Sequence, residues 1–458
     1  MKRLLRIFLI PVCVLAAIAL SGCAADKVAL PMFTAAFEAG DYSGALATAR
    51  RRAKPASAPQ KALLWRLQAG AVERVVGHPA ESNAIFDRCE DAFKFFDLEN
   101  TVKSGGKTVG AVLVNDSIRP YSGEEYDRIL VNTYKALNFS SLGDWDNARV
   151  EFNRALQRQV QAKERFAKEI QKTQGQLAGS DMAAGIGENV ESKELKARID
   201  SVYGNLNPFQ AYPDFVNPFT TYMAGLFFLL RDDLPKAVDI LKEAHGMVPE
   251  NEVVMQDFAS AVEGRMPKGN VWVVFENGGA PIRREMRVDL PLILVTQHVM
   301  YTGIALPVLE LRAPAYPYLE VVSGTEAART TIVADMDRVV QAEFKKDFPG
   351  ILTRAISSAL VKASAQYVAE EQFGFLGGFI VALYSAASTA ADIRTWTALP
   401  KNFQVARVSI PAEGARLEVR PPGGASLEID LPSCTNALVC VRVSRAGVPA
   451  SVQVIVFP

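Results

Sequence analysis

The chain has 458 residues, of which 49% are hydrophobic and 22% are charged, and this is the composition of an ordinary globular protein. Its length suggests about two or three domains. The 50 basic and 50 acidic residues balance one another. A nucleic-acid-binding protein needs a clustered basic excess, so we expect no nucleic-acid partner.

The first residues have the pattern of a secretion signal. Lys2, Arg3 and Arg6 supply positive charge, and an apolar run from Ile7 to Leu20 follows. A helix needs about 20 apolar residues to cross a bilayer, so this run of roughly 14 is too short for a membrane span. We therefore predict that residues 1–22 are a cleaved signal peptide. Its removal leaves 47 basic and 50 acidic residues, a small negative net charge.

Leu20-Ser21-Gly22-Cys23 resembles the lipobox of bacterial lipoproteins. The resemblance implies that a diacylglyceryl group joins the sulfur of Cys23 and that the signal is cut before this residue. Fatty acyl chains such as palmitate would then anchor the mature chain in a lipid bilayer. Ala24 and Ala25 stand where inner-membrane retention takes an aspartate in enterobacteria, so the expected location is the outer membrane, facing the periplasm. A chance cysteine beside an ordinary cleavage site is the alternative.

Residues 23–266 contain a recurring pattern of small and large residues that is typical of tetratricopeptide repeats. In such repeats two antiparallel helices pack closely, because small residues let the backbones approach while large ones fill the gaps. The two clearest copies have as expected packing residues Ala136, Phe139, Ala148, Phe152, Ala155, Gly225, Phe228, Ala237, Leu241 and Ala244. Degenerate copies surround Gly77 and Gly40. An irregular helical bundle with recurrent Gly-Asp turns is the alternative.

The spacing between copies is irregular, so insertions are expected between them. Residues 103–120 include a strand-like run from Thr108 to Val114. A second insertion begins with a charged helix, Gln157–Lys172, and continues into a glycine-rich loop. We expect the helical pattern to return near Ser192.

Residues 267–400 are expected to form a mixed domain of strands and helices. Asn270 to Phe275 is predicted as a buried strand, with Ile282 to Val288 as its partner after a turn. Ala305-Leu306-Pro307 marks a further extended piece. Apolar periodicity predicts a helix over 327–348, a break at Pro349-Gly350, and a second helix from Ile351 to about Glu371.

The segment from Phe373 to Ala391 has nineteen residues without a charge, close to the length of a membrane-spanning helix. It also holds Gly374, Gly377 and Gly378, and a lipoprotein has to stay soluble while it crosses the periplasm. We therefore favour a buried helix packed on the preceding one, with membrane insertion as the alternative.

Residues 401–458 are rich in short strands divided by Pro/Gly turns. The predicted strands favour a small β-sandwich-like domain, and they are Val405–Ile410, Ala415–Val419, Ser426–Leu431, Leu438–Val443 and Ser451–Phe457. Cys434 and Cys440 either form a disulfide in an oxidising periplasm or remain two small buried residues. Cys89 lies in a helical pattern typical of a core. Together these elements predict an α+β fold.

No motif in the chain predicts catalysis. His78, His245 and His298 are scattered without a second ligand at helical spacing, so no metal is expected. Nucleophile-elbow and metalloprotease motifs do not occur in the sequence, so we expect neither an enzyme nor a cofactor.

The sequence also resembles a family of uncharacterised proteobacterial lipoproteins with tetratricopeptide-like repeats. The resemblance covers most of the mature chain, less clearly at the extreme C-terminus. It rests on Tyr126–Ala155, Val216–Phe219 with Gly225, Phe275–Gly278, Ala305–Pro307, and Ala391-Asp392 with Arg394, Trp396, Leu399 and Pro400. Members are often encoded near other outer-membrane lipoproteins, so the resemblance implies a role in the cell envelope.

These observations favour a scaffold that recruits a protein partner for cell-envelope assembly or maintenance. Stacked repeats have a concave face that can bind a peptide or a partner helix, and Tyr134, Asn138 and Tyr222 are candidates for its lining or for packing. One alternative is a component that inserts into a membrane or pore through 373–391. The other is a hydrolase of peptidoglycan or lipid that uses polar residues near Glu276-Asn277-Gly278.

Overall fold

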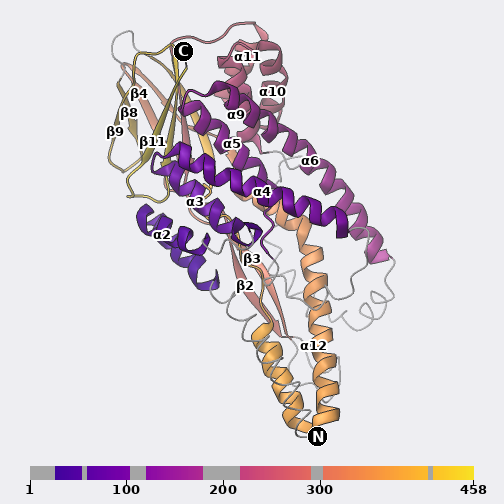
Figure 1. Ribbon diagram of the computed structural model, residues 1–458. Helices are drawn as coiled ribbons and strands as arrows, with labels where there is room; N and C mark the ends of the chain where they lie inside the picture. Colours follow the sequence, from indigo (N-terminus) through magenta and orange to yellow (C-terminus); the bar gives the residue numbers. More distant parts are fainter. Residues whose placement is uncertain are drawn as a thin grey trace.

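The computed structural model describes residues 26–53, 59–103, 120–178, 217–289, 303–410 and 416–457. Within them the protein has an α+β fold, as predicted, with a helical first half followed by strands and one long helical arm (Figure 1). The signal peptide, Cys23, the strand expected near 108–114 and the glycine-rich loop lie outside the described residues.

The first half is a series of helical hairpins. A first helix, described over residues 26–38, is followed by α2 (Tyr42–Ala53), η1 (Pro59–Ala62), α3 (Leu63–Val75), α4 (Pro79–Lys103), α5 (Glu125–Ser141), α6 (Trp145–Ala178), α9 (Pro218–Leu230), α10 (Leu234–Met247) and α11 (Glu252–Val262). The odd-numbered members α3, α5 and α9 are buried nearly throughout, whereas their partners expose one face.

The same tight turn closes four successive hairpins. Gly40, Gly77, Gly143 and Asp232 occupy it with φ angles of 79°, 83°, 73° and 60°. In each case the next residue donates its backbone N–H to the carbonyl five residues earlier, which satisfies an orphan carbonyl at the end of the helix. Glycine is the natural choice for this left-handed conformation, and aspartate tolerates it.

The residues predicted to pack these hairpins are in the core. The small residues Ala136, Ala148, Ala155, Ala237 and Ala244 and the large residues Phe152, Phe228 and Leu241 are at most 1% exposed, and Phe139 is half-buried. Small and large residues therefore interlock as the sequence pattern predicts.

A five-stranded sheet, ordered β11-β10-β1-β7-β6, lies against the helices. Its central strand β1 (Asn270–Asn277) pairs in parallel with β10 (Asn436–Val443) and antiparallel with β7 (Asn402–Ser409). The edges are β11 (Ser451–Phe457) and β6 (Thr331–Asp335).

The other strands form two further sheets among the described residues. One is ordered β5-β4-β8-β9 and consists of β4 (Glu320–Ser323), β5 (Glu326–Arg329), β8 (Arg416–Arg420) and β9 (Leu427–Asp430). The second is a two-stranded ribbon of β2 (Ile282–Asp289) and β3 (Gly303–Glu310).

The five-stranded sheet is the middle of three layers, because β1 alternates its side chains between two cores. Trp272 and Val274 belong to the core of the helical hairpins. Val273 and Phe275 belong to a second core with Val419 of the four-stranded sheet.

Two predictions about the strands were wrong. Ile282 to Val288 does not pair with β1, because β7 and β10 occupy both edges of that strand, and β2 pairs with β3 instead. The strands after residue 400 do not form a separate domain either. They share one sheet with β1 and β6, and the other with β4 and β5.

The long arm, α12 (Met336–Ser388), also differs from its prediction. Residues 331–335 form β6, and the side chain of Asp335 then caps the helix by accepting the N–H of Asp337 at 2.9 Å. The helix passes through Pro349-Gly350 without the expected break. The chain breaks instead at Gly374, whose φ is 70° and ψ −168°. Figure 1 shows the result as an arm that leaves the body and turns back.

Candidate functional site

Large apolar side chains are exposed where α12 turns, in a stretch that we call the arm tip (residues 368–380). Phe373, Phe375 and Leu376 are 57%, 66% and 71% exposed. Val368, Phe379 and Ile380 are between 42% and 48% exposed. Six of the eighteen exposed large apolar side chains among the described residues lie in these thirteen positions. Such concentrated patches mark interaction sites.

The prediction that 373–391 is a buried helix was therefore wrong for its first half. Small residues line the seam, which is the contact between the two legs of the arm, the helical segments before and after Gly374. A Cβ at Gly377 would lie 2.5 Å from the carbonyl oxygen of Ala369, and one at Gly378 would lie 3.1 Å from the Cβ of Glu370. Since the legs approach this closely, large side chains at the turn have no room in the seam and point outward.

The base of the arm meets the first described residues of the chain. The Nζ of Lys27 lies 2.6 Å from an Oε2 of Glu285 on β2, and the same oxygen accepts the backbone N–H of Ala391 at 2.9 Å. The side chain of Arg287 donates to the carbonyl of Thr389 at 3.1 Å. The chain therefore enters the fold beside the residues where the returning leg of the arm ends.

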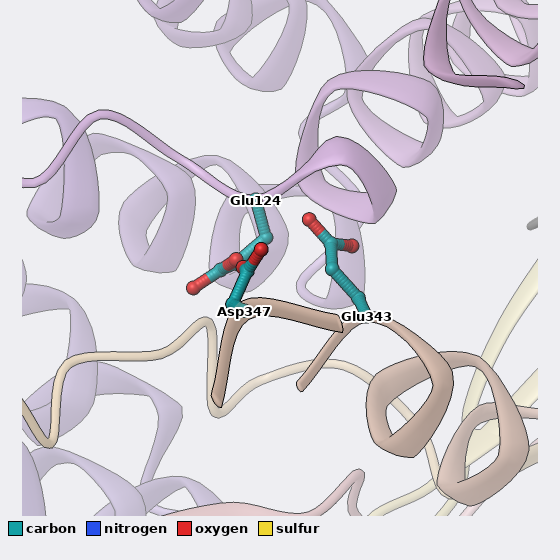
Figure 2. Close-up of side chains that lie close together, drawn as sticks. All are labelled: Glu124, Glu343 and Asp347. Atoms are coloured by element: carbon teal, nitrogen blue, oxygen red, sulfur yellow. The ribbon is translucent and has the colours of Figure 1, made fainter. Parts of the chain in front are cut away.

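Three carboxylates gather between the arm and the start of α5 (Figure 2). Glu124 precedes α5, whereas Glu343 and Asp347 lie on α12 with the spacing that puts two residues on one helix face. One carboxylate oxygen of each lies within 4.8 Å of the others. We call this group the acidic cluster.

The buried member of the acidic cluster has a raised pKa. Desolvation, followed by the charges of Glu124 and Asp347, raises the pKa of Glu343 well above its ordinary value. A carboxyl oxygen of Glu343 accepts the backbone N–H of Glu125 at 2.6 Å, at the N-terminus of α5.

Positive groups balance the other two carboxylates. Arg283 of β2 lies 2.7 Å from Glu124, and Lys346 lies 3.6 Å from Asp347. Oxygen ligands of this kind suit Mg²⁺ or Ca²⁺, but each already has a protein partner. The acidic cluster therefore works as a joint between α5, α12 and β2.

A fourth carboxyl, that of Asp127, lies in the first turn of α5 beside this joint. It accepts the hydroxyl of Tyr121 at 2.6 Å and the backbone N–H of Glu124 at 3.0 Å, completing a capping box. Burial is the largest effect on it and raises its pKa to about 7. The joint thus contains groups that titrate well above ordinary carboxylates.

No protein-family model, curated protein or solved structure matches the chain. Function has to be inferred from the geometry of the described residues. Across these residues, no helix combines the length and the apolar character that crossing a membrane requires.

The structure separates the two cysteines for which the sequence left a disulfide open. Cys434 and Cys440 are both free thiols. Cys440 faces the core of the helical hairpins, whereas Cys434 packs at the edge of the core between the two larger sheets. The two side chains lie in different cores, so a disulfide would require the sheet to rearrange. Cys89 is buried, as predicted.

The three residues considered for the lining of a concave binding face are packing residues in the structure. Tyr134 lies against Trp396 with ring centroids 6.0 Å apart, and the Tyr222 hydroxyl donates to Asp257 at 2.7 Å. Asn138 is fully buried and donates to two side chains of α4. These three residues therefore hold α5 and α9 to the elements around them.

The polar residues near the β1 turn also have structural partners. Glu276 is 2.7 Å from Arg74, and Asn277 accepts the backbone N–H of Ala315 at 2.9 Å. Of the histidines, His78 lies 3.0 Å from Glu73, and His245 stacks on Phe258. His298 lies outside the described residues. Nothing in these contacts favours hydrolysis.

Sequence reasoning missed both the acidic cluster and the exposure of the arm tip. The cluster joins residues more than 200 positions apart, for which no local signal exists. The arm tip did have a local signal, because a glycine interrupts an apolar run that lies between two long helical patterns. From that run we predict a buried segment, whereas the structure exposes its first half.

Proposed function

We propose that the protein is a lipoprotein of the bacterial envelope, anchored in the outer membrane by acyl chains on Cys23 and facing the periplasm, where it acts as a scaffold for a protein partner. The observation that supports this most is the lipobox-like sequence Leu20-Ser21-Gly22-Cys23, which follows a basic start and an apolar run. Asp26, three residues after Cys23, pairs with Arg52 and accepts a hydrogen bond from the indole Nε1 of Trp65 at 3.0 Å. The expected anchor would therefore be held against one fixed place on the body.

The helical hairpins support a scaffold of tetratricopeptide-like repeats. Four of them share one turn geometry, and their small and large residues interlock. Repeats of this kind commonly bind proteins through their inner face. Here the inner helices and the five-stranded sheet share one core, which leaves no open groove on that face among the described residues.

We therefore propose that the partner binds the outer helices α4 and α6. These helices lie side by side, since Arg165 of α6 is 3.4 Å from Asp97 of α4. Leu98 and Val160 are 70% and 56% exposed on them. A protein-binding surface commonly has an apolar centre and a polar rim, and Leu98 and Val160 would supply the apolar part.

Two measurements test this function. Mass spectrometry of the chain purified from membranes should find the first 22 residues removed and fatty acyl chains on Cys23, and Cys23→Ser should remove the acyl mass. Photocrosslinkers at positions 98 and 160 should then capture one envelope protein in cells, while a crosslinker at Val262, equally exposed on α11, captures none. A chain with an intact first residue contradicts the anchor. Capture equal at all three positions contradicts the binding surface.

A further inference from the structure

We propose that the exposed apolar side chains of the arm tip insert into the membrane leaflet that holds the acyl chains of Cys23, as a second membrane contact. This inference rests on the acyl anchor of the proposed function. The occupant of the exposed patch is then the lipid of that leaflet, and the protein is held to the bilayer at two points.

The arm tip has a structure that leaves its aromatic rings exposed. Gly374 makes the turn, glycines close the seam, and Phe375 and Phe379 stack outside it with ring centroids 6.0 Å apart. The body does not cover these rings, and they would have to be ordered in water at a hydrophobic cost. An interfacial lipid environment removes that cost, because aromatic and aliphatic side chains bury favourably at the boundary of headgroups and acyl chains.

Lys27 holds the start of the described chain near the base of the arm. Lys27 is fixed at the base of the arm by Glu285, and Cys23 is four residues earlier. Four extended residues span about 14 Å, so the backbone of Cys23 can lie at most about that far from the backbone of Lys27. The leg after Gly374 has fourteen residues, 375–388, and a helix of this length extends about 21 Å. An arm directed at the bilayer therefore reaches past the level of the anchor.

The first helix adds apolar surface near the same anchor. Val28 and Met32, one helical turn apart, are 62% and 60% exposed within ten residues of Cys23. These two side chains are a second exposed apolar surface, close in sequence to the proposed anchor.

Polar residues set the depth of insertion. Glu371, directly before the apolar turn, is exposed and accepts the hydroxyl of Tyr367 at 2.8 Å. A carboxylate is costly in hydrocarbon, whereas a tyrosine suits the interface. The arm tip therefore enters only to the level of these residues, about one helical turn. A shallow insertion agrees with the finding that no helix among the described residues is long and apolar enough to cross a membrane.

The experiment places a fluorescent reporter on the arm tip of the full acylated chain. Leu376→Trp puts an indole at the most exposed apolar position of the arm tip. The matched control is Val262→Trp, 60% exposed on α11, which Figure 1 shows at the opposite end of the molecule from the turn of α12. Both proteins are reconstituted in phosphatidylcholine vesicles with bromine on the acyl chains, and fluorescence is compared with the unmutated chain and with unbrominated vesicles.

We expect a blue shift and several-fold stronger bromine quenching for the indole at position 376 than for the one at 262. Adding Phe375→Glu and Phe379→Glu should abolish the difference while mass spectrometry still finds the acyl chains. Equal quenching at both positions on an acylated, vesicle-bound protein overturns the insertion. A blue shift that grows with protein concentration and ignores bromine also overturns it, in favour of a second copy of the chain. Quenching at 376 in a protein without acyl mass refutes the proposed anchor and leaves the insertion standing.

Discussion

Gly225 of α9 and Leu241 of α10 touch so closely that a Cβ at position 225 would lie 2.7 Å from the Cδ2 of Leu241. Real Cβ atoms do not approach another atom this closely, so any side chain at position 225 has to push Leu241 aside. Leu241 is fully buried. The spacing of this helical hairpin is therefore set by the absence of a side chain at one position.

Gly225→Ala should lower the free energy of unfolding by about 1–3 kcal/mol, because the added methyl group overpacks a core that cannot relax freely. The matched control is Gly246→Ala in α10, where nothing lies within 4 Å of the added Cβ. That change should raise stability by about 0.5–1 kcal/mol through helix propensity alone. Urea unfolding followed by circular dichroism measures both. Equal effects of the two substitutions would contradict the close packing.

The hairpins were predictable because their signals are local. A glycine at the end of an apolar helical pattern predicts the left-handed turn found at Gly40, Gly77 and Gly143. Small residues such as Ala148 and Ala237, placed at fixed distances from the turn, then predict the packing that the structure shows.

The sheets and the joint were not predictable in this way. β1 pairs with strands more than 100 residues later, and nothing within β2 shows that both edges of β1 are taken. Thr331-Ile332-Val333 continues the apolar periodicity of the following helix, although β-branched residues favour a strand. Tertiary pairing with β7 decided between the two.

Glu343→Gln should stabilise the protein toward alkaline pH and change little in acid. The raised pKa means that the folded state keeps the Glu343 carboxyl neutral, and glutamine imitates that form permanently. At high pH the native chain has to ionise a buried group beside Glu124 and Asp347, and we expect a gain of about 1–3 kcal/mol from removing that penalty. Thermal unfolding across a pH series measures it.

The exposed Glu164→Gln on α6 is the control for this effect, and it should leave the pH profile unchanged. The same samples test cation binding. If Ca²⁺ or Mg²⁺ raised the melting temperature of the native chain, and Glu343→Gln removed that rise, the acidic cluster would be a metal site rather than a joint.

Asp127→Asn should flatten the pH dependence of stability between about pH 4 and pH 7. The pKa of Asp127 is raised from 3.8 to about 7, so its contribution to stability is fully present below pH 4 and is lost as the pH rises to 7. The slope from this group approaches about 1 kcal/mol per pH unit. Asp257 and Asp337, whose pKa values are raised to about 6, add to the slope at the lower end.

The comparison is therefore clearest between pH 6 and pH 7, above the raised pKa values of Asp257 and Asp337. Glu343 also contributes to the slope there, but equally in the native chain and in Asp127→Asn, so the difference between the two reports Asp127. Asp146→Asn, an exposed position in the first turn of α6, is the matched control. An unchanged slope in Asp127→Asn would show that the Tyr121 hydroxyl and the Glu124 N–H keep the carboxylate ionised in the fold.

The ion pair between Arg74 and Glu276 ties the helical layer to the five-stranded sheet. Arg74 ends α3 and Glu276 lies on β1, and the two side chains are 2.7 Å apart with 4% and 2% exposed. Burial is the largest single effect and lowers the pKa of Arg74, but the charge of Glu276, smaller charge effects and the hydrogen bond to Glu276 together raise that pKa above its ordinary value. Arg74 is therefore charged in the folded protein.

Arg74→Met should cost about 3–5 kcal/mol of stability, because it leaves the carboxylate of Glu276 buried without its counter-charge. Adding Glu276→Leu should recover most of this loss, since two apolar side chains of similar volume need no partner. The exposed pair Arg416–Glu428, about 60% exposed on both sides, should show a far smaller coupling, because solvent screens it. A double-mutant cycle by urea unfolding measures both couplings. If the double variant were as unstable as Arg74→Met alone, the Arg74 stem would stabilise the layers by its packing against Tyr134 rather than by its charge.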